Sequence, residues 1–429
     1  MDFKIVFKGL VILLVFFSGS VYSGNKKDKV CPENPIDKCP KGFLCKNLKP
    51  IKGKELKDKM KLLENEYKKK WVLKGSKVSV GTKIWDGAKY ATKKASKNIK
   101  AGVQRIKKQI GKSAVGKKFS KSKTYDLFKQ LRNNVKNYYW VKPMDKDQQS
   151  NIANTEKRTV ILEYKTVNIV NDKETPGIGK TKFYVYQSTK WKGQKRPLLI
   201  IMPPVYGISP FDIGMAVRYV KHGYRVAILE LGGFKFISPF QHTRHIKRVT
   251  VTTMGHVHRL IDYMTKEGDV DKNKIGIFGF SLGGLMASLA FTVNKDIKAL
   301  SLAVGGGNFA EILTNSKQAV AALYRKYRMK EENIKTKEDY FKVMQDAFSF
   351  DPIRFAHLRD SKDVYLVFTE GDSAVPSKNQ RDLERAFSAS CKIGNSRWEQ
   401  GEHFFAIVKD LLKRDKINDF FKSRFGVDK

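Results

Sequence analysis

The second half of the chain alternates strand-like apolar runs with helix-like segments, and this pattern constrains the fold most. Seven runs rich in valine, isoleucine, leucine and phenylalanine predict strands at residues 160–167, 182–187, 197–202, 225–231, 274–280, 298–304 and 364–369. Helical patterns separate several of them, at residues 244–266, 282–291 and 379–387. Continuously apolar strands are expected where helices cover both faces of a sheet. The sequence therefore predicts an α/β domain over residues 151–429, built on a mostly parallel sheet.

One long segment interrupts this alternation before the last predicted strand. Residues 308–358 are helical in pattern and contain no strand-like run. We expect this segment to form a helical cap, inserted between two strands of the sheet.

A Gly-x-Ser-x-Gly motif stands where one predicted strand ends and a helix begins. Gly279 and Gly283 flank Ser281 at two positions before and two after it. A sharp strand-to-helix turn needs residues without side chains at these two positions, because a Cβ atom would strike the neighbouring backbone. The turn lifts the serine hydroxyl above the sheet and directs the start of the helix toward it. We predict Ser281 as a nucleophile.

A serine hydroxyl needs a base to remove its proton and an acid to orient that base. Of the seven histidines, only His403 follows the last predicted strand and precedes a C-terminal helix. Asp372 lies just after that strand, in a Gly-Asp-Ser-Ala-Val-Pro segment. The order Ser281, Asp372, His403 is the order of a triad on a doubly wound α/β sheet.

With these motifs in place, residues 159–421 resemble the α/β-hydrolase superfamily, most closely its dienelactone-hydrolase-like and exported bacterial esterase branches. The resemblance rests on the segments around Ser281, Asp372 and His403. It implies an α/β-hydrolase fold, with helices on both faces of the sheet, and hydrolysis of ester bonds. It does not extend to the basic N-terminal region.

In this superfamily, two backbone N–H groups form an oxyanion hole. One comes from the residue after the nucleophile, here Leu282, and the other from the loop after the third strand. That loop begins with Pro203 and Pro204, which have no N–H to donate. We therefore expect the second donor to be Val205, with Tyr206 as the next choice. No metal or organic cofactor is expected for this chemistry.

The N-terminus predicts export. Residues 1–23 combine two lysines, a short apolar run and small residues before Gly24, which is typical of a cleaved signal peptide. Eight apolar residues reach about 12 Å as a helix, far short of the ~30 Å hydrocarbon core. An uncleaved anchor is the less favoured alternative. We expect an exported protein, either periplasmic, attached to the cell envelope or secreted.

Residues 24–150 form a strongly basic region. They contain 36 lysines and arginines against 11 acidic residues, within a chain of net charge +42. A helical period places apolar side chains on one stripe and lysines opposite: Ile84, Ala88, Ala91, Ala95, Ile99, Val103, Ile106 and Ile110. We expect a basic helical appendage that precedes the hydrolase domain. Its stripe either packs on that domain, which we favour, or lies on an anionic membrane or envelope polymer. Specific nucleic-acid binding is not expected.

Four cysteines suggest disulfides in an exported protein, namely Cys31, Cys39, Cys45 and Cys391. Three pairings are open, and the sequence does not choose among them. A metal site is a weaker reading, because no histidine lies near the first three.

Three functions remain open from the sequence. The first is an exported serine esterase acting on a small-molecule or lipid ester. The second is a serine peptidase on the same fold. The third is a polyanion-binding protein that uses the fold as a scaffold. An intact triad favours the first two.

Overall fold

The computed structural model describes about three fifths of the chain. The described residues are 44, 48–69, 71–80, 160–169, 180–191, 193–205, 207–208, 210–230, 242–401, 403 and 416–427. The chain divides into two compact units, of which the larger comprises Asp28–Lys77 and Ile161–Lys429 and the smaller Met1–Lys27 and Val78–Val160. Of the smaller unit only strand ends are described, so the following concerns the larger one.

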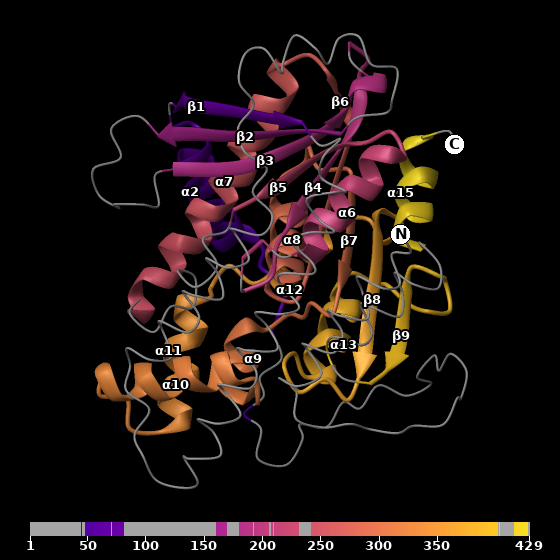
Figure 1. The fold of residues 1–429 in the computed structure, drawn as a ribbon. Coiled ribbons are helices and arrows are strands. Elements are labelled where there is room, and N and C mark those ends of the chain that lie inside the picture. Colours follow the sequence, from indigo (N-terminus) through magenta and orange to yellow (C-terminus); the bar gives the residue numbers. More distant parts are fainter. Residues whose placement is uncertain are drawn as a thin grey trace, which may run out of the picture. The chain divides into compact units, whose positions relative to one another are not determined.

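A nine-stranded sheet forms the centre of this unit (Figure 1). Its strands are β1 (Trp71–Val80), β2 (Val160–Ile169), β3 (Lys180–Ser188), β4 (Arg196–Met202), β5 (Arg225–Leu229), β6 (Val270–Phe280), β7 (Ala299–Ala303), β8 (Val364–Glu370) and β9 (Ser396–Gln400). They lie in the order β1-β2-β3-β5-β4-β6-β7-β8-β9. From β5 to β9 all neighbours are parallel, whereas β3 pairs with β5 in antiparallel orientation. The predicted, mostly parallel sheet is confirmed.

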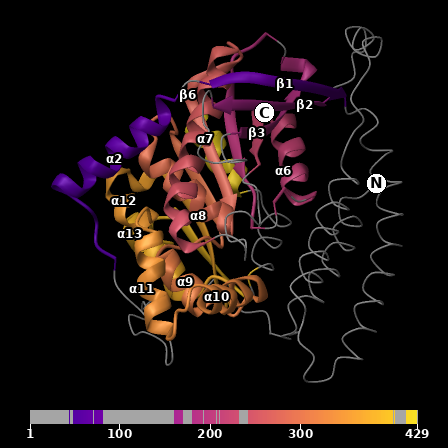
Figure 2. The same ribbon diagram turned by 90° about the vertical axis from the view of Figure 1, so that its left-hand side faces the viewer.

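Helices cover both faces of the sheet. On one face lie α7 (Ile246–Lys266), α8 (Leu282–Val293) and α13 (Ser377–Ala386). On the other face lie α6 (Pro210–Lys221) and α15 (Lys416–Phe425), and Figure 2 shows α6 across the sheet from α7 and α8. Strand β4 is fully apolar and buried from Leu198 to Met202 because it is covered on both sides. The predicted helices over residues 244–266, 282–291 and 379–387 are confirmed within a few residues at each end.

The helical cap is confirmed as well. Between β7 and β8 the chain forms α9 (Phe309–Asn315), α10 (Ala319–Glu331), α11 (Lys337–Ala347) and α12 (Pro352–Phe355). The carboxylate of Asp351 joins the two ends of this insertion: it accepts hydrogen bonds from the N–H of Phe309 (2.7 Å) and of Ile353 (3.1 Å). Burial raises the pKa of Asp351 to about 6, against the opposing effect of these N–H donors.

The structure changes the expected relation between the basic region and the hydrolase domain. Helix α2 (Gly53–Tyr67) and most of strand β1 belong to the larger unit, although the sequence placed both in an appendage that ends at residue 150. Because β1 lies next to β2, residues 81–159 connect two neighbouring strands of one sheet. The most basic stretch is therefore an insertion between edge strands, and not a segment that precedes the domain.

Other N-terminal predictions lie outside the described residues. These are the signal peptide at 1–23, the amphipathic stripe between Ile84 and Ile110, and Cys31, Cys39 and Cys45. Within the described part of the chain, no helix combines the length and apolar character needed to cross a bilayer.

A buried ion pair joins α2 to the domain. The guanidinium of Arg259 on α7 is fully buried and contacts the carboxylate of Glu66 on α2 at 3.3 Å. Glu66 lies against Gly255, where an added Cβ would come within 2.5 Å of the glutamate side chain. Arg259 also donates a hydrogen bond to Thr181 of β3, at 3.2 Å. Helix α2 therefore supplies a carboxylate that compensates the buried charge of Arg259.

A second contact lies nearer the N-terminus. The side-chain amide of Asn315, at the end of α9, accepts a hydrogen bond from the N–H of Leu44 and donates one to its carbonyl, at 3.2 and 2.9 Å. Ile51, 2% exposed, donates its N–H to the carbonyl of Arg354 at 3.1 Å. Leu44 and Ile51 thus contact the cap, while α2 contacts α7.

Replacement of Glu66 tests the buried pair. In the full chain, Glu66→Ala should lower the free energy of unfolding by about 3 kcal/mol, because Arg259 is left buried without its carboxylate. Glu64→Ala is the matched control, since Glu64 is exposed on the same helix, and should change stability by less than about 0.5 kcal/mol. Urea unfolding measures both. Equal stability of the two variants would contradict the ion-pair role.

Candidate active site

Ser281 occupies a strained turn between β6 and α8. Its backbone has φ 56° and ψ −127°, a region that residues with side chains rarely adopt. Two backbone hydrogen bonds hold the turn. The N–H of Ser281 donates to the carbonyl of Ala303 in β7 at 3.1 Å, and the carbonyl of Ser281 accepts from the N–H of Leu285 in α8 at 3.1 Å. The sharp turn predicted from the motif is therefore present.

The flanking glycines allow this turn because the backbones touch there. A Cβ on Gly279 would lie 2.3 Å from the carbonyl oxygen of Gly283. A Cβ on Gly283 would lie 2.0 Å from the carbonyl oxygen of Met202, the last residue of β4. At Gly284 the nearest atoms would be 3.2 Å away, which is tight but not overlapping. The first two positions therefore have no room for any side chain.

The structure brings Asp372 and His403 together. Nδ1 of His403 lies 2.6 Å from Oδ2 of Asp372, and the carboxylate is fully buried. Oδ1 of Asp372 accepts hydrogen bonds from the N–H groups of Ala374 (2.8 Å) and Val375 (2.9 Å). These donors stabilise the charged carboxylate and fix the direction in which it faces the imidazole.

Gln380 is a positioning residue that the sequence did not reveal. Its side-chain N–H group donates to Oδ2 of Asp372 at 2.9 Å and to the carbonyl of Val375 at 2.7 Å. Its side-chain oxygen accepts from the N–H of Thr369 in β8, at 3.0 Å. One glutamine on α13 thus ties the acid to the end of its strand. No motif marks this position; its role follows from the packing of α13 against β8.

The segment before His403 is held by the same strand. The hydroxyl of Thr369 donates to the carbonyl of Gly401 at 2.6 Å, and the N–H of Gly401 donates to the carbonyl of Glu370 at 3.2 Å. Gly401 has φ 123°, which favours glycine at this turn.

The other imidazole nitrogen faces the interior. With Nδ1 donating to Asp372, Nε2 is the atom able to accept a proton. It is buried and has no hydrogen-bond partner among the described residues, so no bond to the Ser281 hydroxyl is formed in this structure. Contacts of this kind are often long before a substrate binds. The triad as a whole stays a prediction.

Of the three predicted oxyanion donors, the structure describes Leu282 and Val205. Leu282 begins α8, where the first N–H groups of a helix have no partner within the helix. Val205, 4% exposed, lines the same cavity as Ser281 and Leu282. Tyr206 lies outside the described residues. Both donor assignments stay predictions.

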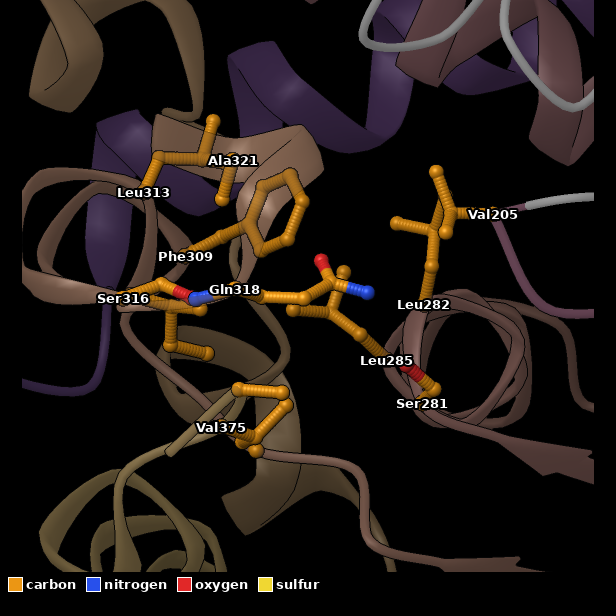
Figure 3. Close-up of a pocket in the computed structure, with 13 residues that line it drawn as sticks. Val205, Ser281, Leu282, Leu285, Phe309, Leu313, Ser316, Gln318, Ala321 and Val375 are labelled. Carbon is orange, nitrogen blue, oxygen red and sulfur yellow. The ribbon is translucent and has the colours of Figure 1, made fainter. Parts of the chain in front are cut away.

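A small cavity of about 40 Å³ lies between Ser281 and the cap (Figure 3). Most of its lining is apolar: Val205, Leu282, Leu285, Gly306, Phe309, Ile312, Leu313, Ala321, Ala374 and Val375. Its polar lining residues are Ser281, Ser316 and Gln318. The nucleophile predicted from the motif therefore opens onto a mostly apolar pocket that α9 and the start of α10 help to close.

Comparison with known proteins agrees with this architecture. A family model described as the prolyl oligopeptidase family matches residues 212–389. The sequence matches no curated protein.

Solved structures with similar folds include both esterases and peptidases. An esterase from an Arctic intertidal metagenomic library is 12% identical, with 62% of this chain and 94% of that one covered and a TM-score of 0.39. An acetyl xylan esterase from Paenibacillus sp. R4 is 10% identical, with 72% and 96% covered and a TM-score of 0.46. An acylaminoacyl peptidase from Pyrococcus horikoshii is 14% identical, with 63% and 48% covered and a TM-score of 0.41.

The strand order, the turn at Ser281 and the family match define the class. The protein has the α/β-hydrolase fold.

A pair of glycine substitutions tests the turn. Gly283→Ala should abolish hydrolase activity and lower the melting temperature, because its Cβ would overlap the carbonyl of Met202. Gly284→Ala, one residue on, is the matched control and should retain measurable activity, because its neighbours need to move by only a few tenths of an ångström. Ester hydrolysis and thermal unfolding measure both. A fully active Gly283→Ala would overturn the argument for close backbone approach.

Proposed function

We propose that the protein is an exported esterase that cleaves carboxylic esters through an acyl-enzyme. Ser281 is the nucleophile, His403 the general base and Asp372 the acid that orients it. One observation carries this proposal: His403 donates to a buried carboxylate through Nδ1 while its Nε2 is buried and unpaired among the described residues. An imidazole held in this way has its basic nitrogen available for a serine hydroxyl.

The reaction proceeds in two steps. The hydroxyl oxygen of Ser281 bonds to the acyl carbon while its proton passes to Nε2 of His403. The ester C–O bond then breaks, and the alcohol leaves with that proton. In the second step water gives a proton to Nε2, bonds to the acyl carbon and releases the acid, and the proton returns to Ser281.

Backbone N–H groups stabilise the charge that develops on the carbonyl oxygen. The N–H of Leu282 lies at the positive end of α8, and the N–H of Val205 comes from the loop after β4. Each such donor contributes roughly 10²–10³ to the rate in known serine hydrolases.

The cavity beside Ser281 accommodates a small acyl group. A volume of about 40 Å³ has room for roughly three water-sized groups, which fits a short acyl chain. The second candidate function, a serine peptidase, is supported by the match to the prolyl oligopeptidase family. The third, polyanion binding without catalysis, is supported only by the charge of the basic region.

The proposal also includes export of the protein and binding of its basic region to an anionic partner. The N-terminal 23 residues support export, and Cys391 is disulfide-bonded, which is usual in an oxidising compartment. We place the protein in the periplasm, at the cell envelope or outside the cell. Residues 81–159 contain 21 basic and five acidic residues, and this charge attracts anionic lipid or envelope polymer.

Removal of the nucleophile tests the catalytic proposal. Ser281→Ala should lower the hydrolysis of p-nitrophenyl acetate by about 10⁴-fold or more and abolish labelling by a fluorophosphonate probe. A panel of short-chain esters and peptide amides, assayed on both proteins, separates esterase from peptidase. Activity unchanged in Ser281→Ala would reject the nucleophile.

Charge neutralisation tests the anionic partner. In the full chain, six lysines are replaced together by glutamine: Lys93, Lys94, Lys97, Lys100, Lys107 and Lys108. Binding to phosphatidylserine-containing vesicles should fall by about tenfold or more, since each basic residue near an anionic surface contributes roughly 1 kcal/mol. The same six positions changed to arginine keep the charge and should keep binding. Co-sedimentation at low salt and at about 0.5 M salt measures the effect. Vesicle binding that is unchanged at high salt and in the glutamine variant would contradict the electrostatic role.

A further inference from the structure

Phe309 is the one aromatic side chain among the described residues that line the cavity beside Ser281. It is the first residue of α9, and its ring lies on the cap side of the cavity, across from Leu285 of α8 (Figure 3). The side chain is buried. A ring of this size takes up space that a substrate chain would otherwise fill.

Packing holds the ring of Phe309 from behind. The ring of Phe348, also buried, meets it edge to face, with 4.3 Å between the two ring centroids. The N–H of Phe309 donates to the carboxylate of Asp351 at 2.7 Å, which fixes the backbone from which the ring projects. A packed ring on a fixed backbone has little freedom to move aside for a longer substrate. Phe309 therefore closes the cavity on this side, and Phe348 lies beyond it.

The other walls leave little room for adjustment. Leu285 belongs to α8, whose start is fixed by the close approach of Gly283 to β4. On another side, a Cβ added to Gly306 would come within 2.7 Å of the side chain of Val375, so these two segments are already in close contact. The cavity therefore gains most space where its largest lining side chain is made smaller, and that side chain is Phe309.

The cavity lies on the acyl side of the proposed reaction. In that mechanism the leaving alcohol takes its proton from His403, so it departs beside that residue. His403 is not among the described residues that line the cavity, whereas Ser281 and the proposed oxyanion residues Leu282 and Val205 are. The group that enters the cavity is therefore attached to the carbonyl carbon and not to the ester oxygen.

The space in the cavity corresponds to a short chain. A cavity of about 40 Å³ has room for roughly three water-sized groups beyond the carbonyl carbon, which gives an acyl chain of about four carbons. A longer chain would have to occupy the position of the Phe309 ring. One methylene that a hydrophobic pocket cannot accept changes kcat/KM by about tenfold or more.

We propose that Phe309 sets the upper limit on acyl length, so that the protein cleaves esters of straight-chain acids of up to about four carbons. The inference rests on the proposed function and adds to it the residue that determines the acyl class. A smaller side chain at this position opens the cavity toward the ring of Phe348. Apolar cavities left by the removal of a large side chain stay dry and take up apolar ligands. Longer alkanoyl chains then become substrates.

The test measures acyl-length preference in the full chain. The p-nitrophenyl esters of acetate, butyrate, hexanoate and octanoate are assayed on the wild type, Phe309→Leu and Phe309→Ala, and the octanoate-to-butyrate ratio of kcat/KM is compared. In the wild type this ratio should be about one tenth or lower. It should rise by about tenfold or more in Phe309→Ala and by a smaller factor in Phe309→Leu, whatever the total activity of each variant.

Phe350→Ala is the matched control. Phe350 is buried in the same insertion and stacks on Phe355, and it is not among the described residues that line the cavity. Phe350→Ala and Phe309→Ala each lose a buried ring, so a lower melting temperature is expected of both. Only Phe309→Ala should change the octanoate-to-butyrate ratio. Phe309→Leu removes fewer atoms and carries the test if the alanine variant does not fold.

A second series keeps the acetyl group and lengthens the alcohol, from ethyl to butyl to hexyl acetate. Its length preference should be the same in the wild type and in Phe309→Ala. The inference is overturned, and the proposed function stands, if the octanoate-to-butyrate ratio is the same in all variants, if Phe350→Ala raises it equally, or if the gain appears with long alcohols instead. If the wild type cleaves none of these esters, or Ser281→Ala cleaves them as fast, the proposed function fails and this inference fails with it.

Discussion

The site depends on one backbone contact, where the ends of β4 and β6 meet the start of α8. Gly283 lies so close to the carbonyl of Met202 that no side chain fits between them, and Gly279 lies equally close to Gly283. Adjacent parallel strands bring these three segments to the same edge of the sheet. Ser281 lies between these close contacts in an unfavourable backbone conformation. The cost of the strained residue is offset by the packing of the apolar elements that converge on it.

The second half of the site is built on hydrogen bonds. Asp372 is buried, and a buried carboxylate is tolerated only when donors surround it. Two N–H groups of its own loop, the amide of Gln380 and the imidazole of His403 supply four of them. The acid is thereby fixed to β8 and α13 and not to the loop alone. The site thus combines a sterically fixed serine with a hydrogen-bonded acid and base.

Short sequence patterns predicted the buried strands and the turn at Ser281, because both depend on residues that are close together in the sequence. Apolar runs marked β4, β6, β7 and β8 because strands buried on both faces are mostly apolar in their central residues. The turn at Ser281 was predictable because steric exclusion leaves only glycine at two fixed positions.

Other features depend on contacts between segments far apart in the sequence. Strand β9, Ser-Arg-Trp-Glu-Gln, has no apolar run and forms at the edge of the sheet against β8. The residues around Gln380 in the sequence form an ordinary helix pattern. Only the packing of α13 brings the Gln380 amide to the carboxylate of Asp372. The pairing of β1 with β2, across about 80 residues of chain, left no local signal either. The basic region therefore looked like an appendage.

The pairing of β1 with β2 makes the most basic segment a connection between two neighbouring strands. A segment whose two ends leave one sheet from neighbouring strands can change its length, charge and composition while the strands stay paired. This segment can thus vary on its own while the strained turn at Ser281 keeps its geometry.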